Sequence, residues 1–245
     1  MTETISRPRA AEGAARKTRP QFVSFTFYKL LPEWRRLPAE VRAAHKAELL
    51  AVLDAADART VVRAYTTVGL RADADLLLWK VSDRLDGLRE LATAVTTTAI
   101  GGYLTTPHSY LAMTRRSQYV GNHRHAGQDG RRTRLRPAGA RYLFVYPFVK
   151  THAWYQLPHA ERQRIMDDHI RVGHAYPSVK INTTYSFGLD DQEFVVAFET
   201  DEPADFLDLV MQLRESEARP FTERDTPIFT CLAMPIADAL EAATG

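Results

Sequence analysis

The stretch RYLFVYPFVKTHAWYQLPHAERQRIMDDHIRVGHAYPSVKINTTYSFGLDD, residues 141–191, decides the fold. Its aromatic and β-branched start predicts a strand over residues 140–150. Leu157-Pro158 opens a helix with helical spacing of apolar residues. Residues 180–187 predict the next strand. The stretch therefore predicts the order strand, helix, strand.

The same order continues on both sides of this stretch. A strand, a helix and a strand follow it, at residues 193–200, 204–219 and 228–234. The first half of the chain predicts elements at residues 21–29, 37–54, 60–69, 74–81, 86–99 and 110–114. Each half thus has the β-α-β-β-α-β order of a ferredoxin-like unit, and the fold class is α+β.

The two halves are an internal duplication. Three landmarks recur: Leu157-Pro158 lies 120 residues after Leu37-Pro38, Gly188-Leu189 lies 119 after Gly69-Leu70, and Leu232-Ala233-Met234 lies 121 after Leu111-Ala112-Met113. Agreement of these offsets over the whole span indicates a repeat. Two such units can pack their sheets face to face and bury the large apolar content.

The composition divides the rest of the chain. Residues 1–20 lack any strand or helix period and predict a disordered tail, with a basic docking arm as the alternative. We expect the two units at residues 21–116 and 140–245. Residues 117–139 form a polar linker or functional loop, in which His123 and His125 lack the further ligands of a metal site.

The overall charge and apolar pattern exclude several partners. The chain has 245 residues with a formal net charge of +2, too little to argue for nucleic acid. No window approaches the roughly 18 apolar residues of a membrane span, and the first twenty residues lack the apolar core of a secretory signal. Cys231 is the one cysteine. We therefore expect a cytoplasmic protein without nucleic-acid or membrane partners.

The duplication serves as a control for function. The positions of Tyr146, Lys150 and His169 correspond to a threonine and two leucines in the first unit, at residues 26, 30 and 49. A residue type kept in both copies serves the fold, whereas a reactive group gained in one copy points to function. The sequence therefore predicts that the second unit carries the chemistry.

His169 is the sharpest candidate for a ligand. With Ile165 and Val172 it falls on one face of a predicted helix. One interpretation is a satisfied core histidine; the other is an axial ligand to a buried macrocycle. Such a ligand needs an acceptor for its second ring nitrogen, and Glu217 on the last predicted helix is the candidate.

Tyr146 shares one strand face with a row of aromatic residues. Tyr142, Phe144 and Phe148 lie at even spacing from it, and so does Lys150. The row is either core packing or the wall of a cofactor site. A phenol and an ammonium beside a cavity suit an anionic ligand and oxidative chemistry.

Two further groups of residues allow both a structural and a functional interpretation. Trp154 and Tyr155 are structural or add redox-active rings. A basic cluster precedes the strand, at Arg131, Arg132, Arg134 and Arg136. It is either a solvated face or a carboxylate-binding group, since the guanidinium fork matches a carboxylate.

Taken together, these residues resemble the chlorite dismutase-like haem protein family. The matching segments are YPFVK at 146–150, WY at 154–155, DDH at 167–169, YP at 176–177, SFGLDD at 186–191, DTPIF at 225–229, GLRADAD at 69–75 and YLTTPHSYLAMTRRSQYV at 103–120. The resemblance covers roughly residues 21–234. It implies a dimeric α+β barrel built from two ferredoxin-like units in one chain, assembled as a homopentamer. It also implies haem in the second unit, with His169 on the iron.

Within that resemblance, the residues favour decarboxylation over chlorite chemistry. Chlorite-degrading members place an arginine on the strand that here comprises Lys180-Ile181-Asn182-Thr183-Thr184-Tyr185, without arginine. We expect Asn182 or Thr184 to face the open side of the iron. The alternatives are a chlorite dismutase or haem peroxidase, or a non-enzymatic haem-binding protein.

The resemblance then implies a coproheme decarboxylase. Iron-coproporphyrin III (coproheme) is both substrate and cofactor, hydrogen peroxide is the oxidant, and haem b is the product. Tyr146 is the radical-forming residue, and Lys150 holds or protonates a propionate. Trp154 lies among the cofactor-binding residues. Arg134 and Thr226 match positions that seat propionates in relatives.

Overall fold

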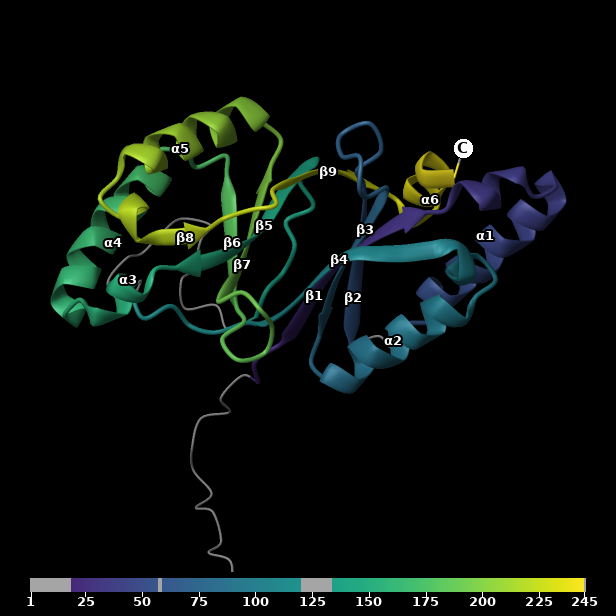
Figure 1. Cartoon of the computed structure of the whole chain (residues 1–245), viewed down its shortest axis with the longest axis horizontal. Helices are drawn as coiled ribbons and strands as arrows, with labels where there is room; N and C mark the ends of the chain where they lie inside the picture. The colour runs from purple at the N-terminus through teal and green to yellow at the C-terminus, as the bar shows by residue number, and fades with distance from the viewer. Residues whose placement is uncertain (1–18, 57–58, 120–133, 245) are drawn as a thin grey trace, which may run out of the picture.

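The computed structural model describes residues 19–56, 59–119 and 134–244 (Figure 1). The first unit comprises β1 (Phe22–Leu30), 3-10 helix η1 (Pro32–Arg36), α1 (Ala39–Asp54), β2 (Thr60–Thr66), β3 (Leu76–Ser82), α2 (Leu85–Thr97), 3-10 helix η2 (Ile100–Tyr103) and β4 (Leu104–Met113). The predicted ferredoxin-like order of this unit is confirmed.

The second unit repeats that order with additions. Its elements are β5 (Tyr142–Lys150), α3 (His152–Gln156), α4 (His159–His174), β6 (Lys180–Tyr185), β7 (Phe194–Thr200), α5 (Pro203–Glu215), 3-10 helix η3 (Arg219–Phe221), β8 (Thr222–Arg224), β9 (Phe229–Met234) and α6 (Ile236–Thr244). The sequence did not predict α3, β8 or α6, all of which are short. It also placed the start of β4 six residues too late, because Thr105, Thr106 and Pro107 interrupt its apolar pattern.

The strands close into a barrel. Their order is β7-β6-β4-β1-β3-β2-β9-β5-β8, and an additional β7–β5 pairing joins the ends of the eight main strands. All the pairings are antiparallel, and the two units meet at β2–β9 and at β4–β6. These pairings confirm the predicted barrel of two units. Closure of the barrel leaves fewer unpaired strand edges than an open sheet would have.

Helices cover the outside of this sheet on both flanks (Figure 1). In the view shown, α1, α2 and α6 cover the first unit on the right, and α3, α4 and α5 cover the second unit on the left. The inner core between the two halves contains Phe25, Trp79, Val145 and Phe229, all fully buried. A separate apolar cluster joins the outer face of β5 and β7 to α4 and α5. The second cluster positions the candidate site.

The predicted N-terminal tail and the predicted linker lie partly outside the residues that the structure describes. Most of the tail and the centre of the linker, including His123 and His125, lie outside the described residues. The end of the linker is docked: the Leu135 amide donates to Gln21 Oε1 (2.7 Å), and Lys180 Nζ donates to the Arg136 carbonyl (2.6 Å). In the described part of the chain, no helix has the length and apolarity needed to cross a membrane.

Candidate functional site

The outer face of β5 presents the predicted row of aromatic residues. Phe144 pairs with Phe198 and Tyr146 with Val196 in the β5–β7 register, so these side chains share one face. The Tyr146 and Phe198 rings stack with centroids 5.8 Å apart, and Phe144 stacks on Phe206 of α5 at 4.0 Å. The aromatic row is therefore both packing and the wall of a space beneath α5.

That space is a cavity of about 410 Å³ between β5 and α5 that is half open to solvent. Its volume is within the range of small-molecule sites, roughly 300–1,000 Å³. The lining is mostly apolar and includes Phe144, Tyr146, Phe206, Met211, Arg214 and Ile228. Met211 and Leu207 are unusually exposed for apolar side chains, at 60% and 58%. An apolar cavity with one guanidinium suits a flat, apolar ligand that carries a carboxylate.

The guanidinium of Arg214 belongs to a charged group at the cavity. Asp225 accepts from Arg214 and, at 2.7 Å, from Arg219. Two cations on one carboxylate leave a net positive charge. Burial raises the pKa of the Tyr146 phenol, and the nearby Asp225 charge raises it further. Tyr146 is therefore a neutral hydrogen donor throughout the neutral pH range.

His169 lies on α4 between two buried residues of that helix, Ile165 and Val172. Burial and then the Lys150 charge lower the pKa of His169 to about 4, against the opposing effect of Asp168. The ring is thus neutral at pH 7, as an iron ligand must be. Its Nδ1 atom is buried and lacks a hydrogen-bond partner among the described residues. A buried ring nitrogen without a partner fits a residue that completes its bonding with a ligand.

Glu217, the predicted hydrogen-bond acceptor for the His169 ring, binds another residue instead. Glu217 binds Arg164 through both oxygens, at 3.1 and 2.6 Å, and its side chain is 59% exposed. The Arg164 hydrogen bonds lower the pKa of Glu217. An exposed carboxylate already held by a guanidinium gains little from a neutral imidazole, so the expectation for Glu217 is corrected.

Lys150 and Trp154 are brought together. Lys150 Nζ lies 4.5 Å from the centroid of the Trp154 ring. Burial lowers the pKa of Lys150 to about 8, while Glu193 opposes the shift. Glu193 accepts from the Lys150 amide at 2.8 Å and from the Tyr155 hydroxyl at 2.6 Å. The Tyr155 hydroxyl is therefore held in a hydrogen bond within this cluster.

Asn182 and Thr184 lie on the wrong face of β6 for a cavity residue. They pair with Ala197 and Val195, which belong to the inner core. The Asn182 amide donates to buried Glu199 (2.9 Å), and the Thr184 hydroxyl donates to the Val195 carbonyl (3.1 Å). The prediction was wrong by one residue, which in a strand exchanges the two faces.

The residues on the helix-facing side of β6 are their neighbours. Ile181 and Thr183 pair with Phe198 and Val196, which belong to the cluster around Tyr146. A Cβ on Gly173 of α4 would meet Ile181 Cδ1 at 3.7 Å. Ile181 therefore points toward α4, the helix that carries His169.

Arg134 contacts the first unit, whereas Thr226 lies near the cavity of the second unit. The Arg134 guanidinium pairs with Asp83 of the first unit at 3.0 Å. Thr226 is exposed and precedes a cis peptide bond to Pro227. Ile228, two residues later, lines the cavity. The structure thus places Thr226 beside the cavity wall and Arg134 on the other unit.

The cavity differs from the predicted one in its second wall. Tyr146 lines it, but the opposite wall is α5, and the described lining does not include His169. Sequence reasoning missed Arg214 and Met211 for this reason. Their spacing with Leu207, at i, i+4 and i+7, was a signal that one helix face is shared. Lys150 links the two parts, since its charge acts on His169.

The comparisons with known proteins agree with this architecture. The chlorite dismutase family model matches residues 42–234. A protein named coproheme decarboxylase from Mycolicibacterium smegmatis (strain ATCC 700084 / mc(2)155) is 35% identical over 176 residues, which are 71% of this chain and 74% of the relative.

Solved structures share the fold. A single-site variant of chlorite dismutase from Candidatus Nitrospira defluvii superposes with a TM-score of 0.85 at 23% identity, covering 94% of this chain and 97% of that one. The same protein in complex with imidazole gives a TM-score of 0.82 at 24% identity, with 92% and 95% covered. On the match to the family model and the identity to a curated relative, this chain belongs to the chlorite dismutase family.

Proposed function

We propose that this protein is a coproheme decarboxylase, which uses hydrogen peroxide to convert propionates of iron-coproporphyrin III to vinyl groups and gives haem b. The observation that carries the proposal is the half-buried, neutral phenol of Tyr146 on the wall of an apolar cavity in the second unit. The relative named coproheme decarboxylase supports the choice of substrate.

The residues fit the porphyrin as follows. His169 would hold the iron through a neutral imidazole, and the apolar walls of β5 and α5 would contact the ring. Arg214, which lines the cavity, supplies a cation for a propionate, with Asp225 orienting it. Placing iron on His169 requires the cavity to extend from Tyr146 toward α4.

The iron porphyrin supplies the oxidising chemistry once peroxide has reacted with it. Tyr146 gives up its hydroxyl hydrogen and then takes a hydrogen atom from the propionate β-carbon. Lys150, with a pKa near 8, holds the propionate or exchanges a proton with it. For each propionate, carbon dioxide leaves, two electrons pass to peroxide, and peroxide becomes two waters.

Mass spectrometry of coproheme incubated with the protein and peroxide tests the proposal. We expect two successive losses of about 46 mass units, for carbon dioxide and two hydrogens per propionate. Recovery of intact coproheme would overturn the proposed function. Adding chlorite and measuring dioxygen distinguishes a chlorite dismutase, and we expect no dioxygen because β6 carries no arginine.

A further inference from the structure

One wall of the cavity is held by the first unit of the chain. Ile228 lines the cavity of the second unit. Its carbonyl accepts a hydrogen bond from Arg71 Nη1 at 3.2 Å. Arg71 lies in the turn between β2 and β3, far away in sequence. A side chain of the first unit therefore holds the backbone of a residue that lines the cavity of the second unit.

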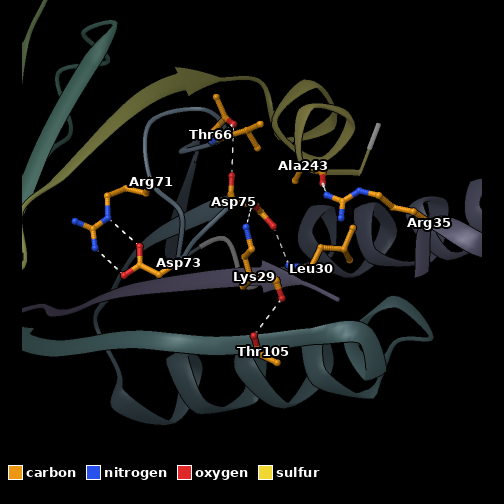
Figure 2. Close-up of polar contacts among 10 residues, drawn as sticks. Lys29, Leu30, Arg35, Thr66, Arg71, Asp73, Asp75, Thr105 and Ala243 are labelled. Atoms are coloured by element: carbon orange, nitrogen blue, oxygen red, sulfur yellow. Dashed lines mark hydrogen bonds and ion pairs between the residues drawn. The ribbon is translucent and has the colours of Figure 1, made fainter. Parts of the chain in front are cut away.

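Arg71 is itself rigidly oriented. Its Nε and Nη2 atoms donate to the two oxygens of Asp73, at 2.9 and 2.6 Å (Figure 2). His108 of β4 contacts the same carboxylate, with Nε2 2.9 Å from Oδ2. Because a two-point pair fixes the plane of the guanidinium, the remaining nitrogen has one direction in which to donate.

Phe229, the residue after Ile228, also contacts the Arg71 guanidinium. The Arg71 guanidinium lies 4.7 Å from the centroid of the Phe229 ring. Phe27 stacks on that ring at 3.9 Å, and His108 meets it edge-on at 4.9 Å. Phe229 pairs with Val145, the neighbour of Tyr146. The position of Phe229 thus fixes β9 against the strand that carries Tyr146.

We propose that Arg71 is a positioning residue for the second-unit site: by holding the Ile228 carbonyl and the Phe229 ring, it sets the place of the Ile228 wall relative to Tyr146. This inference rests on the proposed function only for the identity of the ligand. Without the paired donors of the Arg71 guanidinium, the segment around Ile228 would be free to move away from Tyr146. The site would then bind an iron porphyrin less tightly.

Arg71→Gln and Arg71→Lys in the full-length chain test this inference. Lys46→Ala is the matched control, because it removes an ion pair between α1 of the first unit and Glu241 of α6, and neither residue lines the cavity. Hydrogen exchange of the ligand-free protein reports opening of residues 225–230. Titration with iron-coproporphyrin III reports the dissociation constant, and thermal unfolding reports global stability.

For Arg71→Gln we expect faster exchange confined to residues 225–230 and about tenfold weaker porphyrin binding, the size of one charged hydrogen bond. Arg71→Lys keeps the charge but not the fork, so its effect should be intermediate. The control should match wild type in both measurements.

Wild-type exchange at residues 225–230 in both Arg71 variants would overturn the inference. Weaker binding with exchange raised across the whole chain would also overturn it, since that is general destabilisation. If the wild-type protein binds no iron porphyrin, the proposed function fails, and the exchange data alone then judge the link between Arg71 and Ile228.

Discussion

The ammonium of Lys150 lies over the face of Trp154, with 4.5 Å between Nζ and the ring centroid. A ring quadrupole compensates only part of the lost hydration of a buried cation. Glu193, whose charge raises the pKa of Lys150, already accepts hydrogen bonds from the Lys150 backbone amide and the Tyr155 hydroxyl. Lys150 is therefore a poorly compensated cation beside the site, and it changes charge near pH 8.

Substitution of Lys150 by methionine should remove a pH dependence of stability. The folded pKa is about 8 and the usual value is 10.5, so between these values the unfolded chain binds more protons. Wild-type stability should therefore rise relative to Lys150→Met from pH 8 to pH 10.5, and Lys150→Met should be more stable by on the order of 2 kcal/mol at pH 7. Urea unfolding at several pH values measures this. Parallel curves for the two proteins would contradict the assignment.

Removing the Tyr146 hydroxyl should stop decarboxylation without preventing porphyrin binding. Tyr146→Phe keeps the stacked ring but removes the transferable hydrogen, and we expect at least a 100-fold loss of turnover, the scale of a group that moves hydrogen in the reaction. Tyr142→Phe is the matched control on the same strand face and should keep its activity. Product mass spectra measure turnover. Equal losses in both variants would point to packing instead of chemistry.

Removing the His169 imidazole should weaken binding of the iron. His169→Ala should raise the dissociation constant of iron-coproporphyrin III at least tenfold and change its visible absorption, because the axial bond is lost. His159→Ala, at the start of the same helix, should do neither. An unaltered spectrum in His169→Ala would reject the ligand assignment.

Glu199 should prove essential to stability instead of catalysis. Its carboxylate is 1% exposed and accepts from the Ala138 and Gly139 amides, at 2.9 and 3.0 Å, and from Asn182. Glu199→Ala leaves these donors buried without an acceptor and should cost about 3 kcal/mol of unfolding free energy. Asp201→Ala, on the exposed end of the same edge, should cost less than about 1 kcal/mol. Denaturant unfolding measures the free energy of unfolding of both variants. Equal losses in Glu199→Ala and Asp201→Ala would contradict this account.

Most of the fold could be predicted from the sequence because the duplication gives each of the main strands and helices a second copy. Two independent aromatic strands, 22–30 and 142–150, share a pattern, and so do the helices that follow them. The short elements α3 and β8 were not predictable, since few residues carry too little periodicity. Helix α6 has no counterpart in the first unit, which removed that control.

The candidate site was predictable only in part. The shared face of Phe144 and Tyr146 follows from strand alternation, whereas the catalytic roles of Tyr146 and Lys150 stay predictions. Asn182 and Thr184 were expected at the open side of the iron because they lie on the strand where chlorite-degrading members place an arginine, and that resemblance does not fix which face of the strand each side chain occupies. Glu217 was assigned to His169 by sequence alone, whereas its partner Arg164 lies five residues before His169 on the same helix. Arg71 was invisible as a site residue, because its contact with Ile228 depends on how the two units meet.

A crystal structure of the protein with iron-coproporphyrin III tests the central claim most directly. This account predicts one porphyrin bound in the second unit, with the iron bonded to His169, one ring face toward β5, and a propionate beside Tyr146. A porphyrin held elsewhere, or one that contacts Tyr146 while its iron is bonded to another residue, would contradict it.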